Sequence, residues 1–170
     1  LGSRSRAARI AEMIQRAIPY PVLLVLAEGS GLAVSVAHKR FSLAEKGSIV
    51  AEDFLLSPWA QEPPGDVDRA FHEALSLRNL ALVDFYALYR SITDAVLGRC
   101  CAELTGRFAT GAAVAAPDRR ARLDEHEALG REIASLRGTL RGEERFAEKV
   151  ELNTRIKGLE ARQAAIKASL

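Results

Sequence analysis

The 170-residue chain contains no apolar run near the roughly 20 residues that a membrane-spanning helix needs. Its longest apolar run, from Pro21 to Ala27, ends at Glu28 and the glycines that follow. The arginines at positions 4, 6 and 9 are not followed by the apolar stretch and small-residue cleavage site of a secretory signal. We therefore expect a protein that makes no membrane contact and works in the cytoplasm.

Cysteine is scarce, because Cys100 and its neighbour Cys101 are the only two in the chain. Neighbouring side chains on a helix diverge by about 100°, so a disulfide between them is sterically poor. Redox or metal chemistry would need a CxxC spacing or a nearby histidine, and neither is present. We interpret the pair as one buried, small apolar residue and its neighbour, in a reducing compartment.

Catalytic signatures are missing as well. The histidines at positions 38, 72 and 126 share no ligand spacing, and the chain has no P-loop, no Gly-x-Gly-x-x-Gly segment and no nucleophile–histidine pattern. A restriction-type nuclease would need an acidic-x-lysine pair on a strand, to hold magnesium and support the attacking water. The predicted sheet lacks that pair, and Glu52 and Asp53 point to opposite faces if they lie on a strand. We expect no cofactor, no metal and no enzymatic activity.

What the chain does contain is an ordinary globular balance of 48% hydrophobic and 27% charged residues. Apolar residues at helical spacing predict a helix over 5–18, which Pro19 ends because the residue before a proline avoids helical geometry. The apolar runs 22–27 and 32–38 flank a turn that contains Gly29, and this arrangement predicts a β-hairpin.

A third strand is predicted over residues 48–56, with alternate residues on alternate faces of the sheet. Helical patterns follow over 67–80 and 82–104, and the second carries an apolar stripe from Phe85 to Cys100 that we expect to cover the sheet. Together these segments predict an α+β fold, in which a small antiparallel β-sheet is packed by helices.

The composition changes after a segment rich in small residues. Residues 118–170 contain no Trp, Tyr or Pro, and their apolar residues step by three and four between charged ones, as in a coiled coil. The pattern lapses at Gly142, where a turn is favoured because glycine inside a helix costs about 1 kcal/mol. We therefore predict a core domain over 1–110, a linker over 111–117 and a helical coiled-coil hairpin over 118–170. One helix of twice the length, with a partner chain along its seam, is the alternative.

This C-terminal arm is the main candidate binding surface, because a hairpin buries only a narrow stripe and leaves room for another helix. Its stepping continues to the C-terminal end if Gln163 fills one seam position. Asn153 either specifies register or partner at the seam or faces solvent, and Phe146 and Val150 either close the base of the hairpin or anchor a partner. The candidate partner-binding residues are Leu129, Ile133, Leu136, Leu140, Phe146, Val150, Leu152, Asn153, Ile156 and Leu159.

Clusters of basic residues indicate a second function, contact with nucleic-acid phosphates. The net charge is only +2, so any attraction would come from local clusters and not from the whole chain. The competing interpretation is a solvated surface, because Glu12, Glu103 and Asp124 interleave with the arginines. The candidate contacts are Arg4, Arg6, Arg9, Lys39, Arg40, Arg119, Arg120 and Arg122.

Five stretches of the sequence together resemble a known bacterial family. They are Ala17-Ile18-Pro19-Tyr20-Pro21-Val22-Leu23, the hairpin end His38-Lys39-Arg40, Trp59 ahead of a leucine series that reaches Leu88 and Tyr89, and the arm segments 145–153 and 156–159. In this order and spacing they resemble the domains of unknown function called DUF4391. The resemblance implies gene neighbours that encode a helicase and a DNA methyltransferase, as in restriction or phage-defence modules, and it implies no established activity. It also implies a further N-terminal segment with a strand ahead of the first helix.

From the arm and the resemblance we expect a non-enzymatic accessory or adaptor subunit that docks on a DNA-processing assembly. Its partner would be the neighbouring helicase or methyltransferase, or a second copy of the chain through the arm. One alternative is a nucleic-acid-binding module that uses the arginine clusters. Another is a divergent nuclease, completed by residues upstream of position 1.

Overall fold

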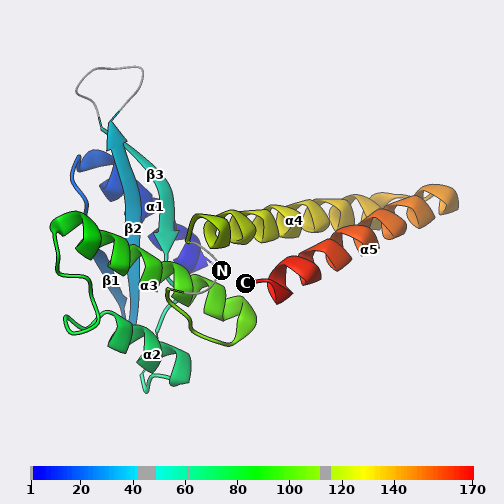
Figure 1. The fold of residues 1–170 in the computed structure, drawn as a ribbon. Helices are drawn as coiled ribbons and strands as arrows, with labels where there is room; N and C mark the ends of the chain where they lie inside the picture. The colour runs from blue at the N-terminus through cyan, green and yellow to red at the C-terminus, as the bar shows by residue number, and fades with distance from the viewer. Residues whose placement is uncertain (1, 42–48, 61, 112–115) are drawn as a thin grey trace. The chain divides into compact units, whose positions relative to one another are not determined.

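The computed structural model describes residues 2–41, 49–60, 62–111 and 116–170. It divides into two compact units, Leu1–Ala112 and Ala113–Leu170, and each is described by itself. The described part of the first unit, unit 1, holds an antiparallel sheet with helices, and that of the second, unit 2, is a helical hairpin (Figure 1). The predicted α+β class with its C-terminal hairpin is therefore confirmed.

The sheet of unit 1 has three described strands in the order β1 (Leu24–Glu28), β2 (Gly31–Phe41) and β3 (Ile49–Leu56). β1 and β2 form the predicted hairpin, at whose turn Gly29 has a φ of 59°, a conformation that glycine adopts without steric penalty. β2 continues beyond the predicted residue 38, because β3 pairs with it as far as Phe41.

β3 departs from simple alternation at Asp53. Val36 lies opposite Leu55, but His38 lies opposite Glu52, so β3 accommodates one extra residue, and Asp53 has a φ of 50°. This bulge puts Glu52 and Leu55 on the same face of the sheet, whereas regular alternation put them on opposite faces. The predicted faces of β3 are therefore wrong across the bulge.

Helices cover both faces of the sheet (Figure 1). On the face covered by α1 (Gly2–Ala17), Lys39 donates from β2 to the carbonyl oxygens of Gln15 and Ile18, at the end of the helix. The buried β2 residues on that face, at positions 33, 35 and 37, are small and let the helix approach closely. α3 (Phe85–Thr105) crosses the other face, where the buried β2 residues are valines.

α2 (Asp66–Ala74) packs against α3, and the buried Arg99 bonds across to Asp68 at 2.9 Å. α2 ends at Ala74 and not at the predicted residue 80. The side-chain amide of Asn79 donates to the Glu73 carbonyl oxygen at 2.8 Å, and this bond holds the chain in a turn after the helix. α3 starts later than predicted, where the Asp84 carboxylate accepts from the Ala87 amide at 2.7 Å.

Unit 2 consists of α4 (Ala116–Gly142) and α5 (Phe146–Ala168), which pack against each other. The turn falls at Gly142, as predicted, so the chain forms a hairpin and not one continuous helix. Among the described residues of this unit, the buried apolar ones are Leu123, Leu129, Ile133 and Ile156.

Candidate functional site

Most of the candidate partner-binding residues of the arm pack in the seam between its two helices. Leu129, Ile133 and Ile156 are buried. The other leucines named above are half-buried, at positions 136, 140, 152 and 159, whereas Asn153 is exposed. The arm therefore satisfies much of its own apolar stripe, which leaves few apolar side chains for a partner.

Charged pairs run along the hairpin and join its two helices. Arg155 bonds to Glu132 at 2.7 Å and Arg137 to Glu160 at 2.6 Å, and Arg162 pairs with Glu125. Each exposed pair of this kind contributes about 0–1 kcal/mol. Their main effect is therefore to favour one register of α5 along α4.

A notch in α4 accommodates a polar side chain of α5. Gln163 is half-buried, and its amide nitrogen donates to the His126 carbonyl oxygen at 3.1 Å. A methyl group on Gly130 would lie 3.1 Å from that nitrogen, so the glycine leaves the room that the glutamine needs. Gln163 thus fills the seam position that the stepping pattern assigns to it.

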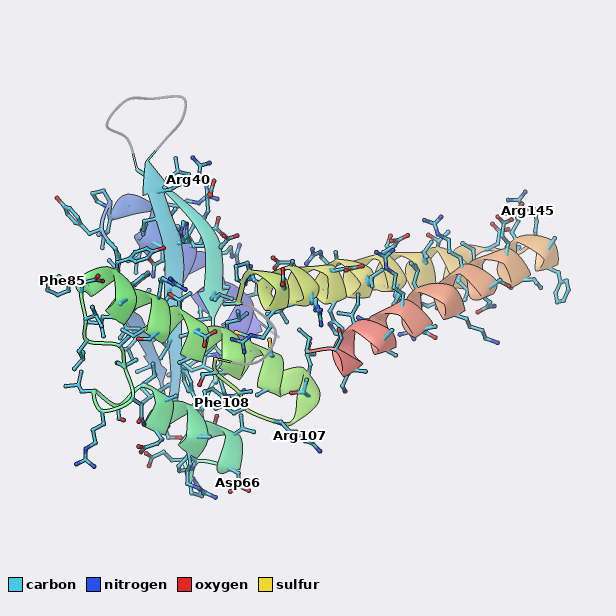
Figure 2. All side chains as sticks on the ribbon, in the orientation of Figure 1. Arg40, Asp66, Phe85, Arg107, Phe108 and Arg145 are labelled. Carbon is cyan, nitrogen blue, oxygen red and sulfur yellow. The ribbon has the colours of Figure 1, made fainter. Side chains whose placement is uncertain are left out.

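Two apolar side chains remain uncovered at the tip of the hairpin. Phe146 is 81% exposed and Val150, one turn later on α5, is 49% exposed. The turn beside them is held by Glu143, whose carboxylate accepts from the Arg145 guanidinium at 3.1 Å and from the Arg145 amide at 2.9 Å. The Arg145 side-chain bond is the main reason that the pKa of Glu143 falls to about 2. The tip therefore presents two apolar side chains next to a turn that Glu143 holds, and Arg145 marks this turn in Figure 2.

Two of the predicted nucleic-acid contacts on β2 already have partners. Arg40, labelled in Figure 2, forms a two-point pair with Glu52, at 2.8 and 2.5 Å, which raises the arginine pKa and lowers the glutamate pKa. Lys39 is half-buried beneath the end of α1, and its burial lowers the pKa of its amine. Both side chains are used within the fold.

The remaining predicted contacts lie on two helices. Arg119 is buried, Arg120 bonds to Asp124 at 2.9 Å, and Arg122 donates to the Ser169 carbonyl oxygen at 2.6 Å. Arg6 and Arg9 are exposed on α1 and make no ion pair within the part of the chain that the structure describes. The Arg4 side chain lies outside the described residues.

Sequence reasoning missed an exposed apolar surface where α3 begins. Phe85, assigned to the inward stripe of the helix, is instead 89% exposed (Figure 2). Four other apolar residues close to it in the sequence are 63–87% exposed. We call the five residues together the α3 patch: Leu77, Leu82, Val83, Phe85 and Tyr86. Every residue from 80 to 89 except Asp84 is apolar, more than one helix face can bury, and that signal was available in the sequence.

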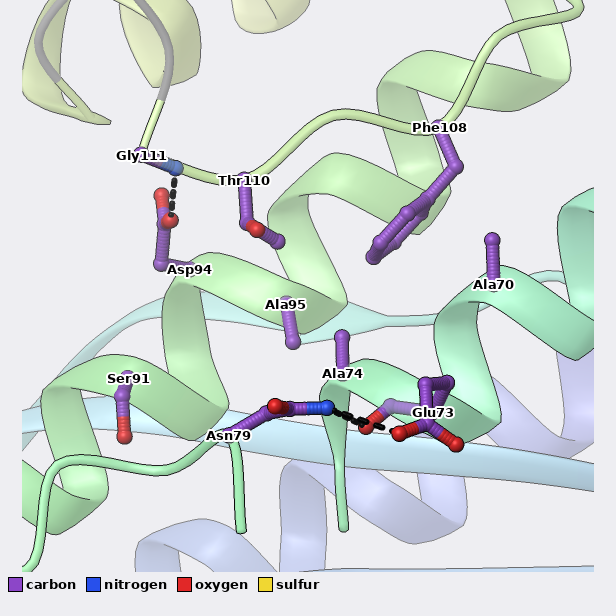
Figure 3. Close-up of a pocket in the computed structure, with 10 residues that line it drawn as sticks. All are labelled: Ala70, Glu73, Ala74, Asn79, Ser91, Asp94, Ala95, Phe108, Thr110 and Gly111. Atoms are coloured by element: carbon purple, nitrogen blue, oxygen red, sulfur yellow. Dashed lines mark hydrogen bonds between the residues drawn. The ribbon is translucent and has the colours of Figure 1, made fainter.

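A pocket of about 480 Å³ opens between α2, α3 and the segment 106–111 (Figure 3). The Asp94 carboxylate accepts from the Gly111 amide at 2.8 Å, and Glu73 accepts from Asn79 at 3.0 Å. The Phe108 ring forms part of the wall. These bonds tie the segment to the two helices, so the acidic groups of the pocket serve the packing of unit 1.

The described residues define the class of the protein: an α+β domain joined to a helical hairpin, with apolar side chains exposed on both. Within the described ranges, no three His, Cys, Asp or Glu side chains are grouped so as to hold a metal ion. Nor do these ranges include a helix with the length and apolar character to cross a membrane.

The chain belongs to the family described as a domain of unknown function (DUF4391), whose model matches residues 1–162. This match confirms the resemblance found in the sequence. No curated protein and no solved structure matches the chain.

Proposed function

We propose that the chain is a non-enzymatic adaptor that docks on a larger protein through the tip of its helical hairpin. The observation that carries the proposal is the exposure of Phe146 and Val150 in the first turns of α5, next to the turn that Glu143 holds. Burying a large apolar side chain is worth about 1.5–3 kcal/mol, so a partner that covers both gains a useful part of its binding energy there. The rest of the seam is occupied within the hairpin, which directs a partner to the tip.

The partner that we propose is a component of a DNA-processing assembly of the restriction or phage-defence type, a helicase or a methyltransferase. Support for this comes from the family resemblance. The tip at which this partner would dock lies about 35 Å from the other end of α5, at 1.5 Å per residue. Cys100 and Cys101 are not joined by a disulfide, which suits the reducing cytoplasm in which we place this function.

The test is a pull-down of the tagged chain from nuclease-treated host lysate, with the double variant Phe146→Asp and Val150→Asp. Both side chains are exposed, so the hairpin still folds, and a defined partner retained by the unaltered chain should be lost. The matched control places the same new charges at Ala161 and Ala164, which are exposed further along α5. Equal retention by the tip variant and the control would mean that the tip is not the docking site.

A second candidate function, binding to nucleic-acid phosphates, rests on Arg6 and Arg9. Both are exposed on α1 without an ion pair among the described side chains. Salt separates the two functions, because phosphate contacts weaken steeply as salt rises whereas apolar contacts do not.

A further inference from the structure

β1 forms one edge of the described sheet, and the hydrogen bonds of β2 show which of its backbone groups point outward (Figure 1). On β2, Leu32 exchanges two hydrogen bonds with Ala60, at 3.0 and 2.8 Å, on the side away from β1. Its partner on β1 is Ala27, so these two residues form a non-hydrogen-bonded pair. In such a pair both residues direct their N–H and C=O away from each other, and those of Ala27 therefore face the open edge.

The same holds two residues earlier in β1. Val34, which lies opposite Val25, accepts from the Ser57 amide at 2.8 Å, again on the side away from β1. The N–H and C=O of Val25 thus also face outward. Neither Val25 nor Ala27 has a hydrogen bond on that side to another described residue. A row of backbone groups at this spacing is completed by another strand, because a strand presents donors and acceptors at the same spacing.

The helices of unit 1 leave this edge largely uncovered. α1 and α3 pack mainly on β2 and β3. Val25 lies on the same face of the sheet as its partner Val34, yet Val25 is 55% exposed and Val34 only 9%. Leu23, two residues before Val25, is 44% exposed. A strand added beside β1 would therefore cover apolar side chains as well as backbone groups.

The two edges of the described sheet differ in how they are protected. β3, at the other edge, carries the bulge at Asp53 and the ion pair of Glu52 with Arg40. Bulges and charged side chains are the features by which edge strands avoid pairing with other molecules. Residues 22–27 contain no charge, proline or glycine, and β1 pairs with β2 in an unbroken register. β3 is thus suited to an outer edge, and β1 to the interior of a larger sheet.

We propose that β1 pairs antiparallel with β1 of a second copy of this chain, about a two-fold axis at Val25. This register places Val25 opposite Val25 of the other copy and Leu23 opposite Ala27, so the outward N–H and C=O groups of these residues are all paired. Glu28, the only charged residue of β1, falls opposite Val22 of the other copy, so no like charges meet. The two three-stranded sheets thereby become one continuous sheet.

A second copy satisfies this edge better than a strand of a different protein. A single added strand would leave its own outer edge unpaired, whereas two-fold pairing uses the apolar edges of both copies and leaves only the protected β3 edges outside. Each copy provides the same donors and acceptors, as a two-fold interface requires. The edge lies in unit 1, so this proposal does not rest on the function proposed for the hairpin.

The test measures the mass of the full chain by analytical ultracentrifugation over a dilution series. We expect reversible association from 18.5 kDa to twice that mass. Val25→Lys should weaken dimerisation about tenfold or more, because it puts like charges opposite each other at the axis. The monomer should still fold, since the Val25 side chain is exposed at an edge. Val83→Lys is the control, because it adds the same charge at an exposed side chain outside the sheet and should leave the dimer unchanged.

A charge-matched pair of variants tests the position of the axis. The Val25→Glu chain should also be monomeric by itself, but an equimolar mixture with the Val25→Lys chain should form a one-to-one dimer, because opposite charges then meet at the axis. Misfolding of either variant cannot produce this rescue. The dimer of the unaltered chain should persist when Phe146 and Val150 are both replaced by Asp, which separates this proposal from that for the hairpin.

A chain that stays monomeric at every concentration overturns the proposal. Amide hydrogen exchange then identifies the other occupant, since protected amides at Val25 and Ala27 would mean that a strand of the same chain covers the edge, and rapid exchange would leave the edge to a different protein. A dimer that Val25→Lys does not weaken, or a mixture of the two charged variants that stays monomeric, overturns the proposal as well.

Discussion

At the scale of single residues, Tyr89 completes a ladder that the strands leave unfinished. β1 and β2 pair Leu24 with Ser35, and the same register continued two residues further would bring Val22 opposite Ala37. The Tyr89 hydroxyl lies at that point, where it accepts from the Ala37 amide at 3.1 Å and reaches the carbonyl oxygens of Val22 and Ala37. One side chain of α3 thereby joins the helix to the end of the sheet.

We predict that Tyr89→Phe lowers the free energy of unfolding by about 1–3 kcal/mol, because the Ala37 amide loses its partner in a partly buried site. Burial also raises the pKa of the Tyr89 hydroxyl. A raised pKa in the folded state means a contribution that is complete below pH 10, where the unfolded tyrosine titrates, and is lost as pH rises further. Urea unfolding at neutral and alkaline pH measures both effects, and the variant should lose less stability in alkali than the unaltered chain.

At the scale of elements, the segment 106–111 lies directly on α3. A methyl group on Gly98 would meet the Ala109 carbonyl oxygen and come within 3.3 Å of the Phe108 ring. Only glycine allows this approach, because backbone on both sides leaves nothing flexible to move.

We therefore predict that Gly98→Ala destabilises unit 1 by about 1–3 kcal/mol through overpacking. Gly138→Ala is the matched control, since its added methyl group meets open space and alanine favours a helix by about 1 kcal/mol. Urea denaturation of the two variants should give changes of opposite sign. If Gly98→Ala left the free energy of unfolding unchanged, the segment 106–111 would move aside without an energetic cost, and the prediction would be wrong.

Local sequence patterns predicted which helices and strands exist better than they predicted the residues at which these begin and end. Apolar spacing was sufficient for α1, the β1–β2 hairpin and the turn at Gly142, because each is a property of neighbouring residues. The bulge at Asp53 depends on the partner strand, and the end of α2 depends on contacts made by Asn79, so neither is visible in one segment.

The same distinction applies to the candidate sites. Phe146 and Val150 were identified from their place beside the turn, which is local. The α3 patch was missed because periodicity shows which face of a helix is apolar. It does not show how much of that face the rest of the fold buries. The buried residues of α3 begin only at Ile92. Leu88 and Tyr89 are half-buried, whereas Phe85 and Tyr86 at the start of the helix are left exposed by the described part of unit 1.

At the scale of the whole molecule, the basic residues are mostly engaged within the fold. Among the described candidates for nucleic-acid contact, Arg6 and Arg9 alone are exposed and make no ion pair or hydrogen bond through their side chains to another described residue. Two neutralised phosphates release few counterions, so the dependence of binding on salt should be shallow.

We predict that labelled duplex DNA binds weakly, with a slope of log K against log salt of about −2, near 0.9 for each neutralised phosphate. Arg6→Glu with Arg9→Glu should abolish this binding in fluorescence anisotropy titrations. Arg131→Glu with Arg141→Glu carries the same change of charge on the hairpin and serves as the control. A slope steeper than about −5 would require more phosphate contacts than these two arginines provide.

The pairing of α4 with α5 has a consequence for how copies of the chain meet. The contacts between α4 and α5 are the same whether the two helices belong to one chain or to two. If the arms of two chains straightened, α4 of each chain would pair with α5 of the other and form the same seam. A short turn holds α5 at an effective concentration in the millimolar range, so at micromolar protein each arm closes on itself. Arm exchange is thus governed by residues 143–145 and by protein concentration, whereas the leucines of the seam stabilise the closed and the exchanged forms equally.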